Sequence, residues 1–184
     1  MASSVDLSNA VRFDLPNGTV HLSDNEKGLL VPASVLASLL ETAAPDVRVR
    51  IGRDLGAHLG RAMARRVGGA AALLEGGLEL AASTLAAELA LAGLGTCALE
   101  RWGRALVVQL TGSPIAATDF VASVVEGALR MATGRTLACT ALSDAGGVRV
   151  LVASESGALR VRGWLEQGVS WSDALVRLQA GGGS

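Results

Sequence analysis

The chain has 184 residues, enough for one domain with a sizeable core; half of them are hydrophobic and 3% are aromatic. Its formal net charge of −1 gives no basis for binding nucleic acid or an anionic membrane through bulk charge. The N-terminus lacks a secretory signal, and the most apolar window, Leu80 to Leu94, is too short to span a membrane. Cys97 and Cys139 form no CxxC pair, so we expect a cytoplasmic protein with free thiols, a disulfide being the minority alternative.

The first third of the chain predicts a hairpin followed by two helices. Residues 1–10 are polar and are expected to fray. The alternating pattern of Val11 to Leu22 around Pro16-Asn17-Gly18 predicts a β-hairpin. A first helix is expected over Val31 to Thr42, and a second over Asp46 to Val67.

Gly52, Gly56 and Gly60 lie four residues apart within this second helix. Each costs about 1 kcal/mol against alanine inside a helix, so the spacing suggests that another backbone packs very close. That backbone belongs either to the same chain or to a second copy. Because the domain has several apolar helices and one small sheet, we expect a homodimer with these three glycines in a two-fold interface.

The middle of the chain predicts a third helix and a second hairpin. The helix covers Leu78 to Leu94, and the strands Cys97–Glu100 and Ala105–Leu110 flank a turn. Trp102 lies at that turn with Arg101 and is expected to be exposed, where it could bind a partner.

The stretch from Asp119 to Ala153 organises the rest of the domain. It predicts an amphipathic helix with Thr118 as its N-cap and Gly134 as its left-handed end. Strands Leu137–Leu142 and Val148–Ala153 follow as a hairpin. Glu126 is the one acid near the apolar face of this helix, and we expect it to be solvent-exposed.

Residues 154–180 form a C-terminal extension. Leu159–Arg162 is expected to be a short strand or an extended link, and Asp173–Gln179 a last helix capped by Ser170 or Ser172. Trp164 and Trp171 are expected to anchor this segment, and both are candidate partner-binding residues. Residues 181–184 read as a flexible tail.

Three segments resemble the 4-vinyl reductase domain family over residues 11–153: the first hairpin with GLLVPASVLASLLE, the helix RIGRDLGAHLGRAM, and VVEGALRMATGRTLACTALSDAGGVRVLV. The resemblance implies an α+β fold, in which helices pack on an antiparallel twisted sheet of about four strands beside the N-terminal hairpin. Small core subunits of the TRAPP tethering complex share this fold. It also implies frequent homodimers and a small-molecule sensing or scaffolding role.

Several members of that family that sense aromatic compounds carry a structural zinc. The corresponding positions in this chain are near Thr118, Ala141, Asp144 and Val150, and of these only Asp144 could ligate a metal. A closed zinc site needs about four ligands, so we expect no metal and no cofactor.

The sequence carries no catalytic signature, since it lacks a GxSxG elbow and a phosphate-binding loop and its two histidines, His21 and His58, are far apart. We therefore expect a non-enzymatic small-molecule-binding or regulatory module. Its hydrophobic pocket is predicted between the helices 31–42 and 78–94 and the sheet. The predicted lining residues are Leu36, Leu40, Leu85 and Leu89. The alternative is a structural adaptor that acts through protein contacts; an enzyme is the third and least favoured function.

Overall fold

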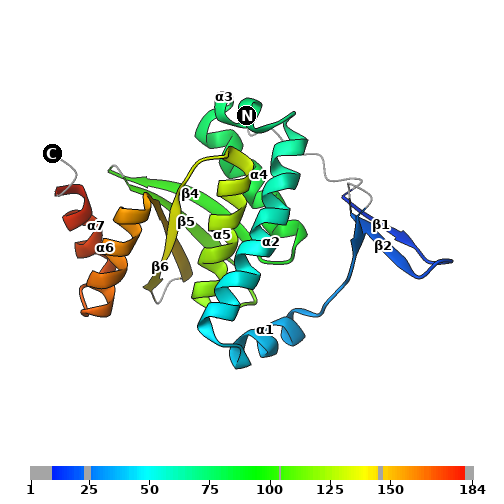
Figure 1. Cartoon of the computed structure of the whole chain (residues 1–184), viewed down its shortest axis with the longest axis horizontal. Helices are drawn as coiled ribbons and strands as arrows, with labels where there is room; N and C mark the ends of the chain where they lie inside the picture. The colour runs from blue at the N-terminus through cyan, green and yellow to red at the C-terminus, as the bar shows by residue number, and fades with distance from the viewer. Residues whose placement is uncertain (1–9, 23–25, 104, 145–146, 181–184) are drawn as a thin grey trace.

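A computed structural model describes residues 10–22, 26–103, 105–144 and 147–180. Over these residues, helices pack on both faces of an antiparallel sheet, and a smaller antiparallel sheet precedes them (Figure 1). The predicted α+β class is therefore confirmed. The strands are β1 Val11–Asp14, β2 Thr19–Leu22, β3 Lys27–Gly28, β4 Thr96–Trp102, β5 Ala105–Thr111, β6 Ala138–Asp144 and β7 Gly147–Ala153. The helices are α1 Ala33–Thr42, α2 Pro45–Arg66, α3 Ala70–Glu75, α4 Gly77–Leu91, α5 Thr118–Thr133, α6 Glu155–Glu166 and α7 Trp171–Ala180.

The larger sheet has the strand order β4-β5-β7-β6. Both predicted hairpins form, and β7 lies between β5 and β6, so β6 is an edge strand. Because side chains alternate along a strand, Val108 and Val150 enter the core cluster that contains α5. Val107 and Leu151 enter a second cluster, formed with α6 and α7 on the opposite face.

Helix α5 is the most enclosed element of the molecule. Every residue from Phe120 to Leu129 is buried, because β6 and β7 cover one side of the helix and α2 covers another. Gly134 ends the helix in the left-handed conformation with φ 67°, as predicted, and its N–H donates to the carbonyl of Arg130. The predicted cap is displaced by one residue, since Ala117 holds the N-cap position and Thr118 is helical.

The glycine row of α2 packs against α5 of the same chain. A Cβ at Gly52 would lie 2.7 Å from the carbonyl oxygen of Phe120, and one at Gly56 would overlap the carbonyl of Val124. Gly60 meets the carbonyl of Ala128 in the same way. The close backbone contact is thus present, but the prediction that these three glycines form a dimer interface is wrong, because α5 already covers them. Dimerisation through another surface stays a prediction.

The four leucines of the predicted pocket belong to the main core cluster. Leu40, Leu85 and Leu89 are at most 2% exposed, and Leu36 packs against them while partly buried. None of the four lines the surface hollows described below. The predicted pocket therefore does not coincide with any of these hollows.

The N-terminal sheet, β1-β2-β3, extends the predicted hairpin by one short strand and lies apart from the larger sheet (Figure 1). Residue 10, which was expected to fray, is buried; residues 1–9 lie outside the described residues. A contact of 3.3 Å between Oε2 of Glu26 and Nδ1 of His58 joins this part to α2. The connection into α1 and helix α1 itself expose large apolar side chains. These are Leu29, Leu30, Val31, Val35 and Leu39, which are 46–84% exposed.

The C-terminal segment folds as two helices. Leu159–Arg162 lies within α6, so the expected strand or extended link is wrong. The hydroxyl of Ser154 caps this helix by accepting from the N–H of Gly157 at 3.2 Å, and Val161 is buried against the sheet. Ser170 caps α7 by accepting from the N–H of Asp173 at 3.1 Å, as one of the two predicted alternatives. Residues 181–184, predicted to be flexible, lie outside the described residues.

Candidate functional site

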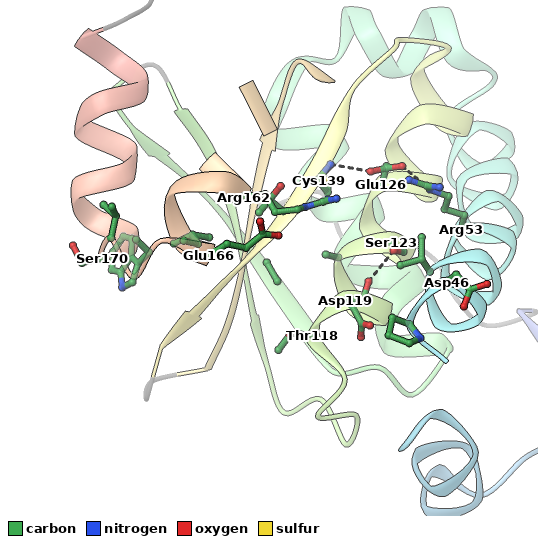
Figure 2. A pocket seen from close by; sticks show the side chains of 18 residues that line it. Asp46, Arg53, Thr118, Asp119, Ser123, Glu126, Cys139, Arg162, Glu166 and Ser170 are labelled. Carbon is green, nitrogen blue, oxygen red and sulfur yellow. Dashed lines mark hydrogen bonds and ion pairs between the residues drawn. The ribbon is translucent and has the colours of Figure 1, made fainter. Parts of the chain in front are cut away.

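A groove of about 870 Å³ runs along the edge of the larger sheet at β6, and it is the largest of the described hollows (Figure 2). One wall comes from the N-terminal halves of α2 and α5, including Val49 and Ala122. The opposite wall comes from the end of α6 and the connection to α7, including Leu165, Val169 and Trp171. The helix layers on the two faces of the sheet therefore face each other across its open edge.

The floor of the groove is the free backbone edge of β6. The N–H of Cys139 donates to Oε2 of Glu126 at 3.0 Å, so this N–H points away from the neighbouring strand β7. In an antiparallel pair, backbone groups of alternate residues point to the same side. The N–H and C=O of Ala141 therefore also point away from β7, along the edge that lines the groove.

Glu126 is buried in the groove wall, with 4% of its surface exposed. Its Oε1 accepts from Nε of Arg53 on α2 at 2.8 Å, while its Oε2 accepts the backbone hydrogen bond from β6. The expectation that this residue is solvent-exposed is wrong, because α2 and β6 both close over this part of α5. The side chain links α5, α2 and β6, a role that the sequence did not predict. The only available signal was an acid inside a run of small and apolar residues.

The rim of the groove carries charged and hydroxyl side chains. Arg48 holds Asp119 by an ion pair of 2.8 Å, and Ser123 donates to the backbone carbonyl of Asp119 at 2.7 Å. Within the described residues, Arg162 and Glu166 make no ion pair or side-chain hydrogen bond. The groove thus mixes apolar, hydroxyl and charged side chains on both of its walls.

The structure brings Trp102 and Trp171 together, a contact that the sequence did not predict. Their rings meet edge to face with centroids 5.0 Å apart, and the Arg149 guanidinium lies 5.3 Å from the centroid of Trp171. Trp164 and Trp171 pack into the second core cluster, which confirms their predicted anchoring role. Trp102 is 37% exposed at its turn, as predicted, and a partner-binding role for the three tryptophans stays a prediction.

The thiols are poor nucleophiles in this fold. Burial, and then the charge of Glu126, raises the pKa of Cys139, and burial raises the pKa of Cys97 to about 11. Both are free cysteines in the described structure. Both therefore stay protonated at neutral pH.

The four positions at which the resemblance would place zinc ligands lie in different surroundings. Thr118 and Ala141 line the groove, Val150 is buried in β7, and Asp144 ends β6. Over the described part of the chain, no group of three His, Cys, Asp or Glu residues is placed to hold a metal ion. In the same part, no helix has the length and hydropathy of a membrane span.

A second, smaller hollow of about 440 Å³ lies where α3 and α4 approach the end of α5. Its lining is mostly apolar and includes Leu74, Leu78, Leu106 and Leu137. Thr133, Thr136 and Ser154 also line it, but its volume is about half that of the groove, so the groove is the larger candidate site.

Comparison with known proteins supports the fold and leaves the family open. No protein-family model matches the chain, and a search of curated proteins gives no significant match. Among solved structures, the chain is similar to the phenol-responsive sensory domain of the transcription activator PoxR, crystallised with phenol. The TM-score is 0.61 at 14% sequence identity, and the match covers 80% of this chain and 86% of that domain. At this identity, the similarity establishes a shared fold.

Proposed function

We propose that the chain is a small-molecule-binding regulatory module and that its ligand occupies the groove beside β6. The observation that carries this proposal is the groove itself, whose volume of about 870 Å³ is within the range of ligand sites. Apolar side chains on both walls, with polar and charged groups placed among them, are a composition found in such sites. A phenol-responsive sensory domain with the same fold supports a sensing role.

A binding role accounts for the groove better than a catalytic one. Glu126 and Asp119 are held in ion pairs, Ser123 donates to the backbone, and the thiol of Cys139 is protonated. Nucleophilic catalysis needs an activated nucleophile within reach of a base, and these side chains do not form such a pair. We therefore favour a non-enzymatic module.

The proposed family and location extend the same argument. We propose a divergent relative of the 4-vinyl reductase domains, of bacterial type and cytoplasmic. The segments that carry the resemblance form the first hairpin with α1, then α2, and then α5, β6 and β7. Of these elements, α2, α5 and β6 line the groove.

The test is ligand binding followed by thermal shift and by native mass spectrometry, with a panel of phenols, naphthols and bicyclic lactams. We expect at least one class to raise the melting temperature of the wild type. Val169→Arg, in the groove, should abolish the shift, whereas Val176→Arg, on an exposed position of α7, should preserve it. Absence of any shift and of any retained compound would contradict the proposal.

The exposed apolar side chains before and along α1 favour a second proposal, a homodimer through this surface. Leu29 and Leu30 are 84% and 65% exposed, and Val35 and Leu39 continue the patch along α1. The same surface would serve the alternative function, a structural adaptor with a different protein partner. Light scattering on the wild type and on Leu30→Glu/Val35→Glu tests the dimer. A monomeric wild type at micromolar concentration would reject it.

A further inference from the structure

The edge of β6 offers a donor and an acceptor side by side. The N–H of Cys139 is already bonded to Glu126, whereas the N–H and C=O of Ala141 have no hydrogen-bond partner among the described residues. They cannot bond to β7, because Thr140 and Leu142 supply the bonds on that side of the strand. A groove ligand that reaches the floor therefore meets one N–H donor and one C=O acceptor of the same residue.

The walls around this edge determine what can approach it. Cys139 and Thr140 are 3% and 4% exposed, and helices rise on both sides of the strand (Figure 2). Ala122 and Leu165 stand on the two walls, so a ligand that reaches β6 passes between these walls.

We infer that the groove recognises a planar lactam or cyclic imide, whose adjacent C=O and N–H pair with the N–H and C=O of Ala141. This inference rests on the proposed ligand-binding function and names the chemical class of the ligand. The flat ring of such a compound packs between the apolar walls, next to Trp171 and Val169. The paired hydrogen bonds fix its orientation, and an analogue without the N–H leaves the C=O of Ala141 unpaired.

The test uses 2-quinolone and 1-methyl-2-quinolone, which differ in the N–H. Calorimetric titration of the wild type should give at least tenfold weaker binding for the methylated compound. In NMR spectra, 2-quinolone should shift the amide resonance of Ala141. Equal affinity for the two compounds, or an unmoved Ala141 amide, would overturn the inference.

A backbone variant tests the same hydrogen bond from the side of the protein. Ala141→Pro removes the outward N–H, and proline is tolerated where the N–H of an edge strand points away from the sheet. Val176→Ala, at an exposed position of α7 outside the groove lining, is the control. We expect at least a tenfold loss of 2-quinolone affinity in Ala141→Pro only. Circular dichroism confirms folding, and if this variant does not fold, the wild-type comparison of the two quinolones decides.

The outcomes separate this inference from the proposed function. If both quinolones bind equally and Val169→Arg abolishes both, the ligand site stands and the lactam assignment falls. If neither quinolone nor any compound of the panel binds, both proposals fall. Binding of the extended peptide N-acetyl-trialanine amide at Ala141, without binding of 2-quinolone, would also overturn the assignment to a small ligand.

Discussion

The two faces of the larger sheet are covered by helices in different ways. On one face, α2 packs so closely on α5 that glycines of α2 contact backbone carbonyls of α5, as Gly56 contacts that of Val124. On the other face, α6 and α7 stand off on large side chains, including Trp164 and Trp171. A contact between backbones has no side chain that can adjust, whereas a contact through side chains can repack. The groove therefore has one wall of fixed shape and one wall that can adapt.

The largest effect on stability is expected when a side chain is added where the glycines of α2 contact α5. Gly56→Leu should lose at least about 3 kcal/mol of unfolding free energy or fail to fold, since the backbone of α5 cannot move aside. The matched control is Gly163→Ala, a helical glycine of α6 with open space around its Cβ. The unfolding free energy of this variant should rise by about 0.5–1 kcal/mol. Urea unfolding measures both, and similar losses in the two variants would refute the contrast.

The next largest effect is expected at Glu126, which joins α5 to α2 and to the edge strand β6. Glu126→Ala removes the acceptor of the Cys139 N–H and the partner of Arg53, and should cost about 2–3 kcal/mol. Glu126→Gln keeps an acceptor oxygen and should cost about half as much. Chemical denaturation of the two variants checks the order. A Glu126→Ala variant as stable as the wild type would show that the link is not needed.

On the adaptable face, Trp171→Ala should cost about 2 kcal/mol, because the ring is partly buried against Trp102 and Arg149. The loss should be local to α7, so hydrogen exchange should accelerate there and stay slow in α2 and α5. Val176→Ala, at an exposed position of the same helix, is the control and should change stability by less than about 0.5 kcal/mol. Uniformly faster exchange in all helices would contradict a local effect.

The smallest effect expected is a dependence on alkaline pH. Burial raises the pKa of Cys97 from 9.0 to about 11, so between these values the thiol ionises in the unfolded chain before it does in the folded one. Stability therefore falls as the pH rises above 9, by about 1 kcal/mol at pH 10 from this residue. Urea unfolding at pH 8 and pH 10 should show a smaller decrease in Cys97→Ser. An equal decrease in both proteins would contradict the assignment.

The sequence predicted most elements because their signals are local. The buried face of α5, its end at Gly134 and the two hairpins of the larger sheet follow from residue spacing and turn residues. Helix α6 was missed because Gly157 and Gly163 weaken its helical pattern, whereas its cap and its burial decide the structure.

The candidate site was harder to predict because its contacts join distant residues. Gly52, Gly56 and Gly60 indicated a close backbone but not which backbone, since the spacing describes one surface only. The partner of Glu126 on α2 is 73 positions away, and nothing in the sequence pairs the two. The groove depends on the free edge of β6, which follows from the strand order rather than from any residue pattern.

The distance in sequence between α2 and α5 has a consequence for folding during synthesis. On the ribosome, α2 is complete well before α5 is synthesised, and until then its three glycines have no surface to pack against. An isolated helix with such an interior is marginal in water, so α2 is expected to remain largely unwound at that stage. Its folding would await the emergence of residues near Ala128. Nascent chains that stop before α5 should therefore be the species most exposed to chaperones and proteases.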